Sequence, residues 1–444
     1  MTDTTEPTDS TDQGSVADRI AAAVDDSPAE EVAARARNRL GDGEPPGLLV
    51  AALGFDGLVY AASRYLPEYL GILGGSALVI GLFGAAAMAL APMAASLRAP
   101  EPPEPSVAAP LLGATGLLVW LVAPELAAAS GLPAWAWILL GLVPLGITAV
   151  TGETAPVEPR PDGFAVGPAA DDWREAAAAG VGVVLAVGLI VGAGTLGAAL
   201  QALLALGAAL GIVVSALRFF AADDETAVDT PPLPEEPPVP RVRPFVRTVR
   251  SVPRAARSLL VGETLIHVSV ALVSVFVIVV VTSVLGLRTT LFGVRLNPSA
   301  TFGALVLTEL AVATAASAAA RRVDAPRDGA ARLVGVAALA AAFPLLFVGL
   351  PPVAGVVAAL FAVAGVRGAG AAIRDERVEA VVSDAAVDPQ QYRTARALVV
   401  APSPLVGGVL YTLDPTVAFG AATTVGAVGV WELWRYARRT DGAL

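Results

Sequence analysis

Long apolar segments fill most of the chain and alternate with short polar or turn-forming breaks. A helix that spans a bilayer needs about 20 mostly apolar residues. Twelve segments meet this requirement, six in each half of the chain: 47–67, 75–97, 107–128, 133–151, 175–194 and 196–220, then 258–285, 301–320, 331–350, 352–372, 395–413 and 415–437. The pattern predicts an all-α membrane protein with twelve transmembrane helices in two six-helix halves.

The breaks between these segments carry turn-forming residues. Gly74-Gly75-Ser76 separates the first two spans, Gly192-Ala193-Gly194 the fifth and sixth, and Pro351-Pro352 the ninth and tenth. Strands are not expected in the spans, because the apolar runs are long and lack a two-residue alternation. Glycine inside the spans favours close approach between helices.

Two polar stretches divide the chain further. Residues 1–45 are acidic and lack the apolar core of a signal peptide. Residues 221–257 are first proline-rich and then arginine-rich, which predicts an extended spacer between the halves. The expected parts are an acidic extension, the first half, the linker, the second half and a short tail: 1–45, 46–220, 221–257, 258–437 and 438–444.

Composition supports a membrane protein and excludes several other classes. Hydrophobic residues make up 55% of the chain and charged residues 16%, against about 25% charged in soluble domains. There is no cysteine, and His267 is the single histidine, so neither a metal site nor another cofactor is expected. The net charge of −11 argues against nucleic acid as a partner. The lysine-free, acidic composition resembles that of proteins from extreme halophiles.

Arginine placement predicts the orientation. If the N-terminus is cytoplasmic, all but three of the 29 basic residues fall on inner segments or span ends; the exceptions are Arg64, Arg288 and Arg295. This is a strong positive-inside bias. We expect a multi-pass protein of the cytoplasmic membrane with both termini in the cytoplasm.

Short motifs in several spans add a family resemblance. They comprise Gly365-Val366-Arg367 with Gly370 and Arg374, Tyr392 with Arg396, Pro404-Leu405-Val406-Gly407-Gly408, Leu259-Leu260-Val261 with Glu263, Tyr65-Leu66-Pro67, and Ile80-Gly81-Leu82-Phe83-Gly84. With two six-helix halves and a basic central loop, the chain resembles the major facilitator superfamily, as a divergent prokaryotic or archaeal member. The resemblance implies a monomeric secondary transporter that works by alternating access.

The chain departs from the family in its gating loops. The loop after the second span, residues 94–101, lacks the aspartate and glycine of the family signature. The loop after the eighth span keeps a scrambled version with Arg321, Arg322, Asp324 and Arg327. The resemblance implies gating contacts there, and it makes Arg374 and Arg396 gate or loop residues.

Ionisable residues inside the spans are the candidates for chemistry. A charge at mid-bilayer costs at least about 2.5–3.5 kcal/mol, so one that persists faces a cavity or a partner. Asp56 and Glu309 lie near mid-depth and could bind a proton on one side and release it on the other. Alternatively, Arg367 or Arg64 neutralises such a carboxylate as a structural contact. Arg367 could equally hold an anionic substrate.

Glu263 and His267 form the remaining candidate. They lie four residues apart, hence on one face of a helix, and such a pair can relay protons near neutral pH. Alternatively, Glu263 pairs with an arginine near the cytoplasmic edge. Asp56 and His267 also occupy corresponding places in the first helix of each half, which would put both at a site between the halves.

These observations predict a transporter and not an enzyme. We expect secondary active transport of a small organic solute, coupled to protons or sodium, in a monomer surrounded by lipid. The alternative is a transporter-like scaffold or receptor that no longer transports, because the loop signature is lost.

Overall fold

The computed structural model describes residues 46–95, 107–151, 173–221, 252–322, 329–385 and 387–441, together with 245–246 and 249–250. The chain divides into two compact units, Met1–Val50 and Ala51–Leu444. Apart from the first residues of α3, every helix that the structure describes belongs to the second unit. The expected division at the 221–257 linker remains a prediction.

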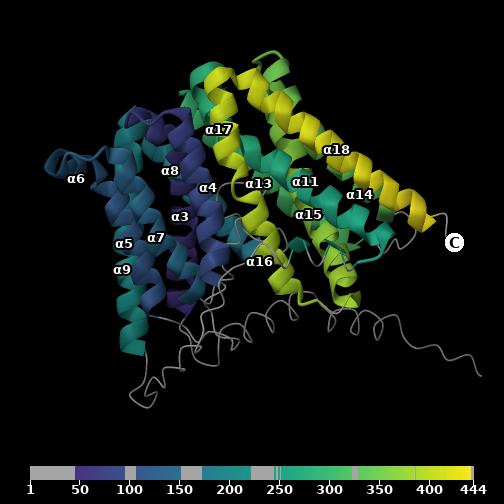
Figure 1. Cartoon of the computed structure of the whole chain (residues 1–444). Coiled ribbons are helices and arrows are strands. Elements are labelled where there is room, and N and C mark those ends of the chain that lie inside the picture. The colour runs from purple at the N-terminus through teal and green to yellow at the C-terminus, as the bar shows by residue number, and fades with distance from the viewer. Residues whose placement is uncertain are drawn as a thin grey trace, which may run out of the picture. The chain divides into compact units, whose positions relative to one another are not determined.

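The first half of the sequence contributes seven described helices (Figure 1). They are α3 (Pro46–Ile72), α4 (Ala77–Ala95), α5 (Ala108–Leu121), α6 (Ala123–Ser130), α7 (Ala134–Thr151), α8 (Trp173–Ala193) and α9 (Leu196–Ala221). Helices α5 and α6 meet at a bend of 61°. Pro124 stands in the first turn of α6, where a proline is tolerated because its missing N–H has no partner in a helix anyway. The third predicted span is therefore broken.

The second half contributes the remaining elements. They are α11 (Arg254–Ser274), α12 (Val277–Val279), the π-helix η1 (Val280–Val284), strands β1 (Thr289–Leu291) and β2 (Val294–Leu296), then α13 (Pro298–Arg322), α14 (Gly329–Gly349), α15 (Ala354–Asp384), α16 (Pro389–Val400), α17 (Ser403–Leu413) and α18 (Pro415–Asp441). The seventh and eleventh predicted spans are each broken into shorter helices.

The two strands form an antiparallel hairpin between the seventh and eighth spans. Its turn residues, Phe292 and Gly293, both have positive φ, 50° and 82°. A two-residue turn of type I′ requires this at both positions. In the part of the chain that the structure describes, this hairpin is the only β structure, and the predicted spans are helical.

Helix length and apolarity agree with the predicted spans. Seven described helices are long and apolar enough to cross a membrane, and the bent α5–α6 pair makes an eighth. Four further apolar helical segments are shorter: Ala77–Leu90, Ala134–Thr148, Leu333–Gly349 and Ala354–Arg367. Each of the twelve predicted spans falls on one of these helices or helix pairs.

Packing within the second unit joins helices that are distant in the sequence. Helix α18 packs against both α11 and α14, which run beside it in Figure 1, and α13 packs against α15. Helix α4 packs against α16 and α17, and α8 against α13. These last contacts connect helices from the two halves of the sequence.

Glycines make the α4–α17 crossing close. A Cβ atom on Gly408 would lie 2.7 Å from the Ala77 carbonyl oxygen, and one on Gly81 would lie 2.5 Å from the Pro404 carbonyl oxygen. Any side chain at these positions would overlap the opposite backbone. Small residues that let two backbones approach are the usual basis of helix association in lipid.

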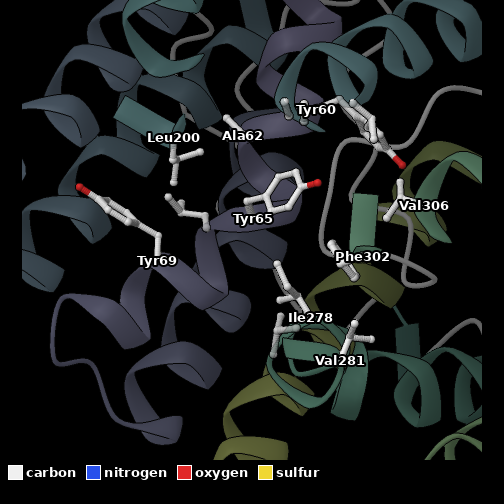
Figure 2. Packing of buried hydrophobic residues seen from close by; sticks show 14 of the residues in the cluster. Tyr60, Ala62, Tyr65, Tyr69, Leu200, Ile278, Val281, Phe302 and Val306 are labelled. Carbon is white, nitrogen blue, oxygen red and sulfur yellow. The ribbon is translucent and has the colours of Figure 1, made fainter. Parts of the chain in front are cut away.

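Aromatic and branched side chains fill the region where α3 meets α12, η1 and α13 (Figure 2). Tyr65 and Phe302 pack edge to face, with ring centroids 5.6 Å apart. Ile278 and Val281 lie beside them and are almost fully buried. Phe302 and Ile278 also line a cavity that contains the side chains of Arg64 and Glu309.

A capping contact fixes the turn between α17 and α18. The Asp414 carboxylate accepts a hydrogen bond of 2.6 Å from the Thr416 backbone N–H. Hydrogen bonds from Thr416 lower the pKa of this carboxyl below its usual value, because they stabilise its ionised form. Asp414 thus satisfies an unpaired donor at the start of α18.

Candidate functional site

A cavity lies between α3, α11, α12, α13, α14 and α15. Its walls are mostly apolar, with valine, phenylalanine and proline side chains. The polar lining residues are Ser63, Arg64, Ser274, Glu309 and Arg367. The centre of a water molecule can reach about 40 Å³ of it, which is room for a few waters. The charged lining residues determine what this cavity can bind.

Arg64 and Glu309 form an ion pair inside the cavity. Arg64 Nη2 donates to Glu309 Oε2 at 2.7 Å, and the side chains are 14% and 19% exposed. At 1.5 Å per residue, Arg64 lies about 12 Å from the end of α3 and Glu309 about 17 Å from the start of α13. Both are therefore near mid-depth of a hydrocarbon core about 30 Å thick. The pair joins helices from the two halves of the sequence.

Aromatic rings support both arginines of the cavity. The Arg64 guanidinium lies 5.8 Å from the centre of the Phe302 ring, and that of Arg367 lies 5.6 Å from the Phe343 ring. Such contacts are attractive and strengthen where water is excluded. Two guanidinium groups and one carboxylate leave the lining with an excess of one positive charge. The cavity is suited to an anionic group.

Glu263, His267 and Arg374 form a second charged cluster. Arg374 Nε lies 2.9 Å from Glu263 Oε2, and His267 Nδ1 lies 3.1 Å from Glu263 Oε1. His267 Nδ1 is also 2.8 Å from the Glu263 carbonyl oxygen, which suits the tautomer that carries its hydrogen on Nδ1. All three residues are at most 2% exposed. The cluster joins α11 to α15 and does not line the cavity.

Helix ends explain where the structure differs from the sequence-based expectations. Arg64 was expected on the outer side, but α3 continues to Ile72, so Arg64 lies well inside the helix. Arg374 was expected in a gate or loop segment, but α15 continues to Asp384 and contains it. In both cases the helix continues past the end of the apolar run. Arg396, which the predicted eleventh span already contains, lies in α16 with its guanidinium 6.0 Å from the centre of the Tyr392 ring. The gating role of Arg374 and Arg396 remains a prediction.

The other predicted gating residues are only partly described. Arg321 and Arg322 are the last two residues of α13. Asp324 and Arg327 lie outside the described residues, as does the loop after α4. The gating role of these residues remains a prediction.

Asp56 lies away from the cavity. It is within electrostatic range of Glu175 on α8 and Arg218 on α9, all three on helices of the first half. The neighbouring Gly57 packs against α8 so closely that a Cβ atom there would overlap the Ala178 carbonyl. Helices α3 and α11 do both line the cavity, as the internal correspondence predicted, but they do so through residues other than Asp56 and His267.

Sequence reasoning proposed Arg64 only as one possible partner of Glu309 and did not place it in a site. The feature of the sequence that could have indicated such a partner was the isolated carboxylate of Glu309. A mid-membrane glutamate needs a counter-charge, and few arginines lie within the predicted spans. Which arginine faces Glu309 depends on helix rotation, which the sequence pattern does not specify.

No protein-family model matches the chain, and no curated protein matches it. Several solved structures do match the chain. A POT family transporter in complex with 5-aminolevulinic acid has a TM-score of 0.59 and 15% identity, over 87% of this chain and 94% of that chain. A peptide transporter POT in complex with sulfate has a TM-score of 0.56 and 15% identity, over 89% and 96%. For the nucleoside transporter NupG the values are 0.52 and 12%, over 87% and 96%.

At such identities the likeness shows the fold alone, since one fold can serve several functions. It extends over nearly the whole of each chain, and the apolar helices agree with it. The prediction of an all-α, multi-pass membrane protein is confirmed. The described helices of this chain share the fold of these solved transporters.

Proposed function

We propose that this protein is a secondary transporter of a small solute that carries an anionic group, coupled to protons through Glu309. The observation that carries the proposal is the Arg64–Glu309 ion pair inside the central cavity. The proposed mechanism is alternating access, in which one six-helix half rocks against the other around a site at mid-depth.

An ion pair at this depth is not explained by its contribution to stability alone. Replacing a buried ion pair with apolar residues is often neutral or stabilising, whereas charged groups within the membrane mark pathways for ions and substrates. The Arg64–Glu309 pair can be released in two ways. A proton can neutralise Glu309, or a solute anion can take its place on Arg64.

These two events favour each other. Once Glu309 is protonated, Arg64 and Arg367 leave the lining with two positive charges, and an anion binds more readily. By reciprocity, a bound anion promotes protonation of Glu309. Proton and solute would then move together. Sodium bound to the Glu309 carboxylate is the alternative coupling ion.

The structural neighbours support this class of solute. Two of them were crystallised with 5-aminolevulinic acid and with sulfate, and both compounds carry an anionic group. The cavity has room for only a few waters, so a solute of this kind requires it to widen. Relative movement of α3 and α13 would widen it and would also separate Arg64 from Glu309.

The test is transport by the purified protein in liposomes, with carboxylate, zwitterionic and neutral solutes. Glu309→Gln is compared with Asp56→Asn, an equivalent acid-to-amide change in a span but away from the cavity. We expect Glu309→Gln to abolish accumulation driven by a pH gradient while solute exchange at equal pH continues. Asp56→Asn should retain both activities.

The remaining outcomes are equally informative. Loss of driven accumulation in Asp56→Asn alone would move the coupling role to that residue. Accumulation driven by a sodium gradient and not by a pH gradient would show that sodium, and not the proton, is the coupling ion. Absence of flux for the whole solute panel in the unmodified protein would favour the scaffold or receptor alternative.

A further inference from the structure

A basic patch lies where α18 ends and the chain enters α11. We define it by the described residues of 249–257 and 431–441, because α11 and α18 pack along each other. These segments contain two acids, Glu432 and Asp441, and Arg435 binds Glu432 at 2.7 Å. They contain three times as many arginines: Arg250, Arg254, Arg257, Arg435, Arg438 and Arg439.

Backbone carbonyls hold two of these arginines in place. Arg439 Nη1 donates to the Arg254 carbonyl oxygen at 3.2 Å, which ties the end of α18 to the start of α11. Arg257 Nη2 donates to the Arg250 carbonyl oxygen at 2.9 Å. A carbonyl orients a guanidinium group without neutralising its charge. The patch therefore combines ordered side chains with a positive potential.

Two exposed tryptophans lie beside the arginines of the basic patch. The rings of Trp431 and Trp434 lie 5.1 Å apart and are 56% and 38% exposed. The Arg438 guanidinium lies 4.7 Å from the centre of the Trp434 ring. Tryptophan is enriched at the level of lipid headgroups, where one part of the ring is apolar and the other is wet. These rings therefore favour headgroup depth for the arginines beside them.

We propose that the basic patch binds the phosphate group of an anionic phospholipid, with Trp431 and Trp434 against the upper part of its acyl chains. Arginine presents a planar fork of donors that matches phosphate oxygens. Basic clusters immediately beside a transmembrane helix attract anionic headgroups. The tryptophans distinguish this site from one for a soluble phosphate or a nucleic acid, neither of which needs an apolar surface.

The test uses the full chain in nanodiscs of neutral phosphatidylcholine, titrated with phosphatidylglycerol and followed by native mass spectrometry. The double variant Arg438→Gln/Arg439→Gln should retain phosphatidylglycerol at least about fivefold less well than the unmodified chain. The matched control is Arg288→Gln/Arg295→Gln. It removes the same charge from two exposed positions, Arg295 within β2 and Arg288 next to β1, and should leave retention unchanged.

Two further measurements distinguish binding of the whole lipid from binding of its headgroup alone. Trp431→Ala should weaken retention of the lipid, and soluble glycerol phosphate should not compete with it at equal concentration. Arg438→Lys/Arg439→Lys should retain more lipid than the glutamine variant, because the charge remains while the fork is lost.

Three results would overturn the proposal. The first is equal retention of phosphatidylglycerol and phosphatidylcholine by the unmodified chain. The second is an equal loss in both double variants, which would indicate a general charge effect. The third is full competition by glycerol phosphate, which would indicate a soluble anion site.

Discussion

Charged residues inside the helix bundle occur in two different environments. Arg64 and Glu309 line a cavity and are partly exposed to it. Glu263 and Arg374 are 0% exposed and lie outside it. The same chemistry therefore has different consequences: an ion pair partly exposed to a cavity can exchange partners, whereas a fully buried pair holds two helices together.

The cavity pair can be tested by removing either partner or both. Arg64→Gln and Glu309→Gln should each lower the free energy of unfolding by about 1–3 kcal/mol, since each leaves an unpaired charge. The double variant should lose less than the sum of the two. Thermal unfolding in detergent measures this coupling, and simple additivity would show that the two charges do not interact.

The buried cluster of Glu263, His267 and Arg374 should be more sensitive to the loss of its carboxylate. Glu263→Gln breaks the fully buried Arg374–Glu263 ion pair, and we expect a cost of about 3–5 kcal/mol. Glu379→Gln provides the matched control. It breaks the Arg393–Glu379 pair of 2.6 Å, which is largely exposed, and should cost at most about 1 kcal/mol. Equal shifts in melting temperature would contradict this distinction.

At the scale of elements, helix crossings depend on where glycine permits close approach. Gly81 and Gly408 form the contact between α4 and α17, which connects the two halves of the sequence. A rocking mechanism needs small residues at this contact, because bulky side chains would interlock the two helices and hinder their relative movement. Both glycines belong to the motifs that carry the family resemblance.

Gly408→Val tests the crossing. The new side chain would meet the Ala77 carbonyl and the backbone of Leu78 and Gly81, and we expect a loss of about 1–3 kcal/mol from overpacking. Gly420→Val in α18 is the control, because a Cβ atom there has no neighbour within 4 Å. Transport and melting temperature should both fall in the first variant and change little in the second.

At the scale of the whole molecule, helices from both halves line the cavity. Alternating access requires this cavity to open to each side of the membrane in turn. The chain offers a clean test because it contains no cysteine. A single introduced thiol therefore reports on one position without background.

Ser274→Cys places the thiol on the cavity wall. A membrane-impermeant thiol reagent should label it from either side of a sealed vesicle, and labelling should change when a pH gradient is applied. Ser130→Cys, at the exposed end of α6, should be labelled from one side only and regardless of pH. Labelling of Ser274→Cys from one side alone would argue against alternation.

The sequence by itself determined the class of fold. The length and apolarity of each span are local properties, because lipid requires every backbone polar group to be satisfied within the helix. The twelve spans, and the glycine and proline breaks between them, were therefore predictable. Polar continuations of helices were not, because the last turns of α15 carry charged residues that read as loop.

Only the tertiary structure decided which charges meet. Arg64 and Glu309 are far apart in the sequence, and so are Glu263 and Arg374. Their pairing depends on how each helix is rotated about its axis and on which helices are neighbours. Those properties follow from close packing across many contacts, including the glycine crossing of α4 and α17. The sequence pattern showed that buried charges need partners, and the packing of the helices chose them.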